Sequence, residues 1–227
     1  MPVLALDTSG AVAVAVTDDA GTVLAARSAA EPRRHAELLA PMIAEALAEA
    51  GLRPADVTAV VAGTGPAPFT GLRVGLVTAR SFALALGVPV HGVPSLDTLA
   101  AQAARDLAAP DGTEVLVVTD ARRREVYWAR YVVRGGAALL VDGPDVAAAS
   151  TLAADELARG VVAGRGAALY PEDLPLTPGA PLDPDPADLA REALRRLAAG
   201  ETDLPTEPLY LRRPDAVPAG GHKRATG

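Results

Sequence analysis

The chain has 227 residues, half of them hydrophobic, and a formal net charge of −7. This size suits one large domain or two small lobes, and the apolar content supports a sizeable core rather than disorder. The absence of cysteine excludes disulfides, a thiol nucleophile and a cysteine-based zinc site. We find no apolar run of about 18 residues and no basic-then-apolar start, so we expect neither a membrane span nor a signal peptide, and a cytoplasmic location.

The first part of the chain is predicted to alternate short apolar strands with amphipathic helices. The predicted strands are Val3–Leu6, Ala11–Val16, Thr22–Ser28, Val57–Ala62 and Val88–Val93. The predicted helices are Arg34–Ala50 and a second one from about Phe69 to Leu86. A hairpin turn at 18–21 separates the second and third strands.

The second part repeats this pattern less clearly. A helix is predicted over Leu96–Leu107, with Ser95 as its N-cap. Further predicted elements are the strands Glu114–Thr119, Glu125–Val133 and Val161–Ala163 and the helix Pro186–Ala199. We divide the chain into an N-terminal lobe at 1–100, a shortened second lobe at 101–211, and a tail at 212–227 that we expect to be disordered.

The order of the predicted elements favours an actin-like α/β fold over a doubly wound Rossmann fold. Three antiparallel strands followed by alternating helices and strands are typical of an actin-like, ribonuclease-H-like lobe, here in two copies with mixed sheets. A doubly wound Rossmann fold is less consistent with a chain that opens on a hairpin pair.

The helix after Phe69 carries a stripe of small residues. Gly71, Gly75, Ala79 and Ala83 recur at every fourth position and therefore share one helical face. Because an internal glycine costs roughly 1 kcal/mol relative to alanine in a helix, two glycines on one face indicate close packing. The partner in that packing is either another subunit or the chain's own core.

Two strand-end turns are candidates for nucleotide binding. Asp7, Thr8 and Ser9 follow the first strand, and Asp120 ends the strand at 114–119. Such turns can present backbone N–H groups to phosphate and a carboxylate to Mg²⁺. The alternative is that each aspartate only caps its own turn.

Other chemistry has little support in the sequence. The loop at 63–66 fits neither a Walker motif nor G-x-G-x-x-G, so a structural role is favoured. The three histidines show no metal-binding spacing, and we expect no metal, no catalytic residue and no cofactor. The acidic charge argues against strong stand-alone nucleic-acid binding, although the cluster at 122–124 could add a phosphate contact.

Several segments together resemble one bacterial family. LALDTSGAVAVAV, HAELLAPMI, GTGPAPFTGLRVGLVTARSFALALGVPVHGVPSLDTLA, DARRREVYWARY and PLYLRRPDA occur in the order found in the TsaB (YeaZ) family. The resemblance spans roughly residues 3 to 215. The sequence departs from the family pattern at Ala67 and Pro68, where glycine and serine are usual.

The resemblance implies an actin-like fold and a role in making threonylcarbamoyladenosine beside the tRNA anticodon. It implies a non-catalytic subunit that pairs with the catalytic TsaD subunit and the ATPase TsaE, forms a homodimer when alone, and meets tRNA only through the complex. The alternatives from the residues are a stand-alone actin-like ATPase or kinase and a ribonuclease-H-type nuclease. The nuclease would need more paired carboxylates than Asp7 and Asp120.

The resemblance also implies that the helix at 69–86 forms part of the partner surface. The residues carried over to this surface are Phe69, Gly71, Leu72, Gly75, Leu76, Ala79, Phe82 and Ala83. Packing of the same stripe against the chain's own sheet remains the alternative, because a helix has two sides.

Overall fold

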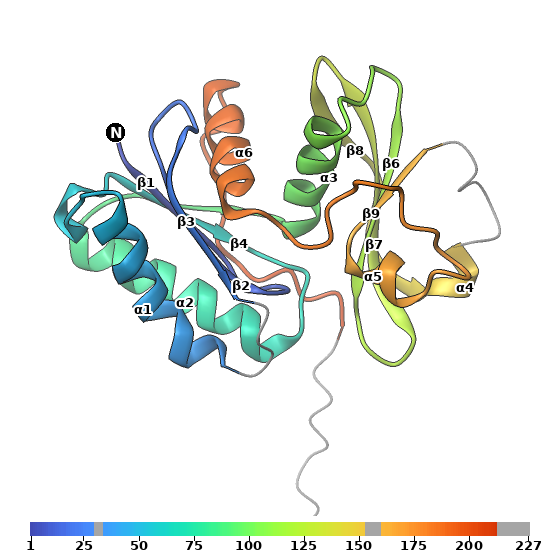
Figure 1. Ribbon diagram of the computed structural model, residues 1–227, viewed down its shortest axis with the longest axis horizontal. Helices are drawn as coiled ribbons and strands as arrows, with labels where there is room; N and C mark the ends of the chain where they lie inside the picture. The colour runs from blue at the N-terminus through green and yellow to red at the C-terminus, as the bar shows by residue number, and fades with distance from the viewer. Residues whose placement is uncertain (30–33, 153–159, 213–227) are drawn as a thin grey trace, which may run out of the picture.

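The computed structural model describes residues 1–29, 34–152 and 160–212 and shows two mixed sheets, each flanked by helices (Figure 1). Of the tail at 212–227, which we expected to be disordered, residues 213–227 lie outside the described residues, whereas Arg212 is described and donates a hydrogen bond to Ala121 O. The α/β class and the two-lobed arrangement follow the sequence prediction.

The first sheet has five strands in the order β3-β2-β1-β4-β5. Its strands are β1 (Val3–Asp7), β2 (Val12–Thr17), β3 (Val23–Ala29), β4 (Ala59–Gly63) and β5 (Val90–Val93). β1, β2 and β3 pair antiparallel, whereas β4 and β5 run parallel to β1. This arrangement confirms the predicted mixed sheet with its opening three-strand antiparallel meander.

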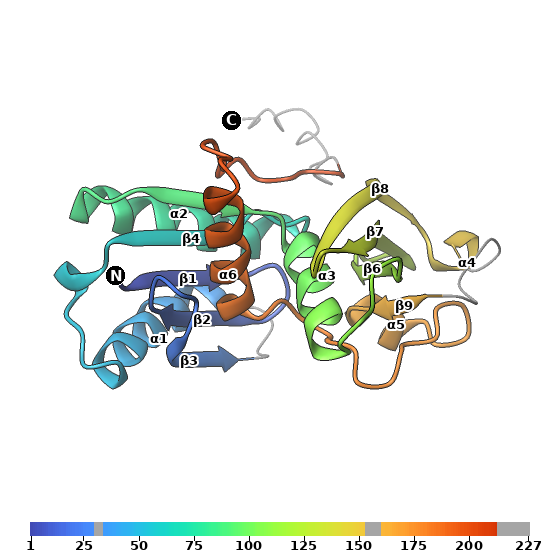
Figure 2. The ribbon, with the colours of Figure 1, turned by 90° about the horizontal axis from the view of Figure 1, so that it is seen from above.

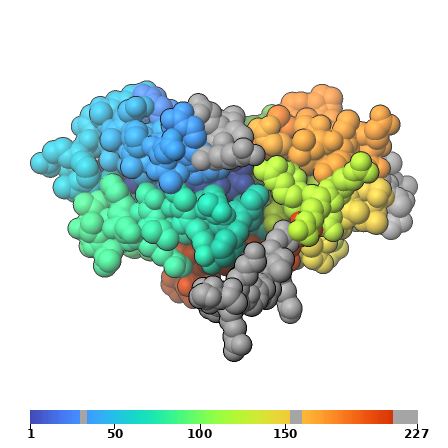
Figure 3. Space-filling model, turned by 90° about the horizontal axis from the view of Figure 1, so that it is seen from below, coloured from blue at the N-terminus to red at the C-terminus, as the bar shows by residue number. Residues whose placement is uncertain are grey.

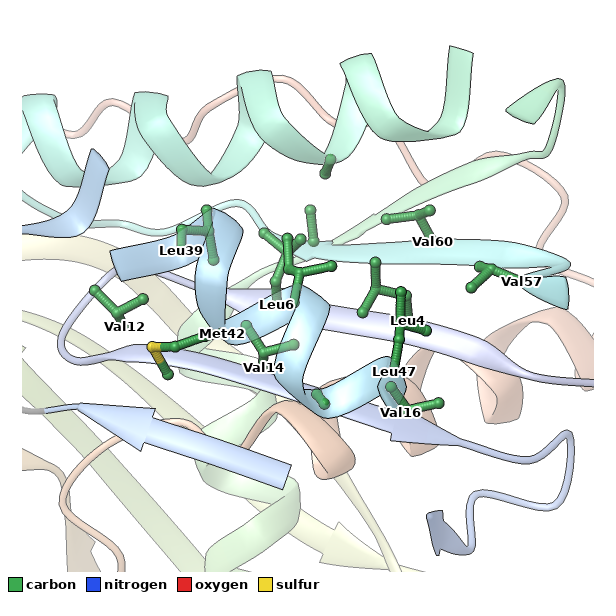
Figure 4. Close-up of a cluster of buried hydrophobic side chains, with 14 of the residues drawn as sticks. Leu4, Leu6, Val12, Val14, Val16, Leu39, Met42, Leu47, Val57 and Val60 are labelled. Atoms are coloured by element: carbon green, nitrogen blue, oxygen red, sulfur yellow. The ribbon is translucent and has the colours of Figure 1, made fainter. Parts of the chain in front are cut away.

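Helices cover both faces of the first sheet. This agrees with its strands β1, β2 and β4, which are almost continuously apolar and therefore need burial on both sides. On one face Leu4 and Leu6 pack under α1 (His35–Glu49) and α2 (Phe69–Leu86), with Leu39 and Leu47 between helix and sheet (Figure 4). The short helix η1 (Pro54–Asp56) leads from α1 into β4. On the other face Val3, Ala5 and Val61 pack under α6 (Pro186–Ala198).

The second sheet has four strands in the order β8-β7-β6-β9. They are β6 (Glu114–Asp120), β7 (Glu125–Arg134), β8 (Ala137–Ala148) and β9 (Val161–Ala163), with β9 parallel to β6. The helix α3 (Ser95–Asp106) covers one face, and α4 (Ala149–Leu152) and α5 (Arg165–Leu169) lie on the other. This lobe repeats the first with one strand fewer, so the fold is actin-like.

The helices α3 and α6 stand side by side between the two sheets (Figures 1 and 2). The boundary between the two lobes therefore differs from the one that we predicted at residue 100. The apolar residues of α3, beginning at Leu96, pack with the second sheet, whereas α6, which we assigned to the second lobe, packs on the first. The chain therefore returns to the first lobe near residue 186.

A buried polar network joins α3, α6 and β7. Arg196 donates to Asp97 at 2.5 Å and to Glu192 at 2.8 Å, and the Tyr131 hydroxyl donates to the other Asp97 oxygen at 2.6 Å. Burial, with the neighbouring Asp97 carboxylate, raises the pKa of Tyr131. The network holds a helix of the first lobe against the second.

Candidate functional site

The first strand-end turn is built around a buried carboxylate. Asp7 is 1% exposed; its Oδ1 accepts from the Ser9 N–H at 2.7 Å and the Ser9 hydroxyl at 2.5 Å. Its Oδ2 accepts from the Ser95 hydroxyl at 2.6 Å, and that hydroxyl also accepts from the Gly65 N–H at 3.2 Å. Burial raises the pKa of Asp7, while the bonds from Ser9 and Ser95 oppose the shift.

Asp7 therefore holds together three segments that are distant in sequence. The turn after β1, the loop at 63–66 and the first residue of α3 all meet at this carboxylate. A Cβ on Gly63 would stand closer than 3.0 Å to its Oδ2, which explains why only glycine fits there. Ser95 does not cap α3 as predicted, because its hydroxyl is bonded to Asp7 instead.

Thr8 also makes a hydrogen bond within the fold. It is 2% exposed, and its hydroxyl donates to the Gly71 carbonyl at 2.9 Å. The turn after β1 is thereby tied to the first turn of α2. The loop at 63–67 is buried throughout, in agreement with the structural role that its prolines suggested.

The second strand-end turn has its own internal cap. Asp120 accepts from the Arg122 N–H at 2.8 Å and pairs with the Arg122 guanidinium at 3.1 Å. The structure thus brings Asp7, Thr8 and Ser9 together and places Asp120 on the other sheet. Both aspartates cap their own turns, the alternative that the sequence left open.

Within the described ranges, no group of three or more His, Cys, Asp or Glu side chains is arranged to hold a metal ion.

The backbone of this second turn is unusual. Arg122, Arg123 and Arg124 have φ values of 64°, 56° and 62°. This left-handed region costs a non-glycine residue roughly 1–2 kcal/mol. All three side chains are exposed.

Asp183 lies beside the first turn, in the connection that leads back to the first lobe. A Cβ on Gly10 would stand 2.8 Å from Asp183 Oδ1, and the same oxygen accepts from Arg165 Nε at 2.9 Å. After burial, the negative charge of Asp183 also raises the pKa of Asp7. An ion pair between α5 and this connection thus borders the turn where a nucleotide phosphate was expected.

The small-residue stripe of α2 faces the chain's own core. Five of the eight predicted interface residues are buried there: Leu72, Gly75, Leu76, Ala79 and Ala83. A Cβ on Gly71 would stand 3.0 Å from the Thr8 carbonyl oxygen, and one on Gly75 closer still to the Thr8 hydroxyl. The prediction that this stripe contacts a partner is therefore corrected to the core-packing alternative, while Phe69 and Phe82 are only partly buried.

The outer face of α2 is partly apolar. Leu84 is 84% exposed and Val77 is 62% exposed. Within the described ranges, α2 is the one helix long and apolar enough to suit a membrane span, with a mean hydropathy of 1.3. Its inner face lies in the core, and its outer arginines bind another segment of the chain.

That segment is a strap, residues 204–212, which runs along β5 and α2. Its backbone forms hydrogen bonds with the first lobe. The Gly92 N–H donates to Leu204 O at 2.8 Å, and the Leu209 N–H donates to Thr64 O at 2.9 Å. Arg80 donates to the Thr206 hydroxyl at 2.8 Å and to its carbonyl at 2.7 Å. The strap thus covers part of α2's outer face.

Aromatic and cationic groups fix the far end of the strap. Tyr210 stacks on Phe69 with 4.9 Å between ring centroids, and the Arg73 guanidinium lies 3.5 Å from the Phe69 centroid. Arg73 Nε also donates to the Tyr210 hydroxyl at 2.8 Å. Arg212 then crosses to the second lobe, where it donates to Ala121 O at 2.6 Å and pairs with Glu125.

Sequence reasoning missed this strap. The segment 204–212 has neither helical nor strand periodicity, and its contacts on α2, β5 and the β6–β7 turn lie far away in sequence. The available signal was the aromatic Tyr210 beside two arginines in an otherwise irregular stretch.

Comparison with known proteins gives matches in sequence and structure. The family model described as TsaD, tRNA N6-adenosine threonylcarbamoyltransferase, matches residues 24–164. An uncharacterized protein of Mycobacterium tuberculosis is 43% identical over 196 residues, covering 86% of this chain and 83% of that protein. The Escherichia coli tRNA threonylcarbamoyladenosine biosynthesis protein TsaB is 41% identical over 132 residues, which is 58% of this chain and 55% of its own length. The structure of YeaZ from Pseudomonas aeruginosa matches with a TM-score of 0.76 at 33% identity, covering 92% of this chain and 99% of YeaZ.

Proposed function

The chain belongs to the TsaB/YeaZ family, and on that premise we propose that it is an accessory subunit in the synthesis of threonylcarbamoyladenosine in tRNA. The observation that carries the proposal is the match to YeaZ, which covers 99% of that structure. The 41% identity to E. coli TsaB, which is named for the synthesis of threonylcarbamoyladenosine in tRNA, also supports the proposal.

The strand-end turns support an accessory rather than a catalytic role. In an actin-like ATPase these turns would present carboxylates and N–H groups to a nucleotide and its metal. Here both Asp7 oxygens accept hydrogen bonds from Ser9 and Ser95, and Asp120 binds its own turn. Both carboxylates thus make hydrogen bonds within the fold itself.

We infer that the partner surface includes the outer face of α2 and not its small-residue stripe. Leu84 and Val77 offer apolar area on that face, and the ion pair between Arg80 of α2 and Glu207 of the strap gives it a polar border. An apolar centre with a polar rim is the usual composition of a protein interface. The proposed partners are the catalytic TsaD subunit, the ATPase TsaE and, without them, a second copy of this chain, all in the cytoplasm.

Light scattering on the chain, alone and mixed with TsaD from the same organism, tests this function. We expect a homodimer that exchanges into a mixed complex. Leu84→Arg should weaken both assemblies, because it places a charge in the apolar centre. Leu140→Arg is the matched control, since Leu140 is 49% exposed on β8 in the other lobe. Failure of the unmodified chain to join TsaD would refute the proposal.

A further inference from the structure

The strap joins the two lobes at a place separate from the contact between α3 and α6. In that helix contact, Arg196 of α6 donates to Asp97 of α3 at 2.5 Å. At the end of the strap, Arg212 donates to Ala121 O at 2.6 Å and pairs with Glu125 of β7. Figure 1 draws α3 and α6 in the upper half of the molecule and the end of the strap below them, near the lower ends of β6 and β7. Figure 3 looks onto this lower side, with the β6–β7 turn in yellow-green.

The first lobe holds the strap very close to Arg212. Tyr210 stacks on Phe69 of α2 with 4.9 Å between ring centroids, and its hydroxyl accepts from Arg73 Nε at 2.8 Å. Only Leu211 separates Tyr210 from Arg212. Because an extended chain spans at most about 3.6 Å per residue, these two steps reach roughly 7 Å. So short a connection has little slack, and a movement of one lobe away from the other must pull on the strap.

The other end of the strap binds on both sides of a strained turn. Residues 122–124 all have left-handed φ values, between 56° and 64°. Ala121 comes directly before them and Glu125 directly after them, and Arg212 contacts both. Strained backbone persists only where the surrounding structure holds it in place. Arg212 is therefore part of what keeps the β6–β7 turn in its conformation.

The contact between Arg212 and the turn is able to open and close. The Arg212 side chain is 23% exposed and the Glu125 side chain is 35% exposed. Partly exposed ion pairs are weak, because water and salt compete for their charges. Breaking this pair leaves both groups within reach of water, so the strap can release the turn without leaving a buried charge unpaired.

We propose that the strap is a latch between the two lobes, which couples the outer face of α2 to the β6–β7 turn. In the closed state Tyr210 packs on α2 while Arg212 holds the turn. In the open state both contacts are lost together, and the second lobe is free to move away from the first. Because coupling between two sites is reciprocal, release of either end loosens the other. The latch does not depend on the proposed function, since both of its ends belong to the isolated chain.

Amide hydrogen exchange on the isolated chain tests the coupling from both ends. The Ala121 N–H donates to Glu125 O at 3.0 Å, so its exchange rate reports on the turn, and the Leu209 N–H reports on the strap. Tyr210→Ala should speed exchange at Ala121 by about fivefold or more, although the substitution lies on the α2 side. Arg212→Gln should speed exchange at Leu209 in the same way.

The distance between the lobes is the second measurement. The chain has no cysteine, so spin labels attach only at introduced sites, Ala48→Cys on α1 and Val141→Cys on β8, both of which are exposed. We expect one narrow distance distribution in the labelled chain and an added longer distance in both Tyr210→Ala and Arg212→Gln. The matched control is Arg134→Gln, which removes the same charge from an exposed position at the opposite end of β7 and should change nothing.

Three outcomes would overturn the latch. The first is an unchanged distance between the labels in either variant. The second is unchanged exchange at Ala121 in Tyr210→Ala, because the two ends of the strap would then act independently. The third is a loss of protection in β1 and β4 in both variants, which would make the strap a part of the core of the first lobe. Protected strands with an added longer distance would support the proposal.

Discussion

The Thr8 hydroxyl occupies the space that a side chain at Gly75 would need. A Cβ built on Gly75 would stand closer than 3.0 Å to Thr8 Oγ1, a separation that real Cβ atoms do not show. Thr8 is buried and bonded to the Gly71 carbonyl, so it has little room to move. The turn after β1 and the helix α2 therefore approach each other through a glycine.

Gly75→Ala should destabilise the protein by about 1–3 kcal/mol, although alanine is the better helix former. Urea denaturation measures the change. Thr8→Ala removes the obstructing atom, so the double variant should lose less stability than the sum of the two single variants. Additive losses would show that the two residues do not compete for space.

The small-residue stripe illustrates what spacing can and cannot reveal. The recurrence of small residues at every fourth position correctly indicated that one face of α2 packs closely against a neighbouring segment. The pattern could not say what approaches that face, because a sheet of the same chain and a helix of another subunit both demand small side chains. The structure decides for the chain's own core, where the stripe approaches Thr8 in the turn after β1, about 65 residues away along the chain.

The sheets were predictable to different extents for a physical reason. β1, β2 and β4 are buried on both faces and stand out as apolar runs. β8 is an edge strand that contains Gly143 and Pro144, residues that a sequence pattern takes as a break but that an edge strand tolerates. The helix α6 was predicted from its pattern, but amphipathicity does not say which sheet it covers.

Asp7 should make stability depend on pH. Its pKa in the fold is raised above the unfolded value by burial, so its contribution is fully present below about pH 3.8 and is lost as the pH rises through the raised pKa. Asp7→Asn cannot ionise. The free energy of unfolding of this variant, minus that of the unmodified protein, should therefore increase with pH above 3.8. Urea denaturation at pH values from 4 to 8 measures it.

Ser95→Ala provides the control for the pH dependence. The Ser95 hydroxyl favours the ionised form of Asp7, so its loss should raise the pKa further and extend the pH dependence upward. Parallel curves for Asp7→Asn and the unmodified protein would contradict the assignment to Asp7.

Arg196 should matter far more to stability than its neighbour Arg195. Arg196→Met leaves Asp97 without its cation in a site where the Arg196 side chain is 18% exposed, and we expect a loss of roughly 3 kcal/mol. Arg195→Met is the matched control, because Arg195 also pairs with Glu192 but is 43% exposed. Its loss should be below about 1 kcal/mol. Similar midpoints in urea for the two variants would show that the bridge between α3 and α6 contributes little.

The stack of Tyr210 on Phe69 should keep the strap closed over α2. Tyr210→Ala removes the ring contact and the hydrogen bond from Arg73, at an expected cost of about 0.5–1.5 kcal/mol beyond the area lost. Amide hydrogen exchange should speed up at Leu209, whose N–H is bonded to Thr64, while the core of the first sheet stays protected. Tyr210→Phe keeps the ring and should shift the exchange only slightly. Unchanged exchange in Tyr210→Ala would mean that the backbone bonds of residues 204–212 alone hold the strap in place.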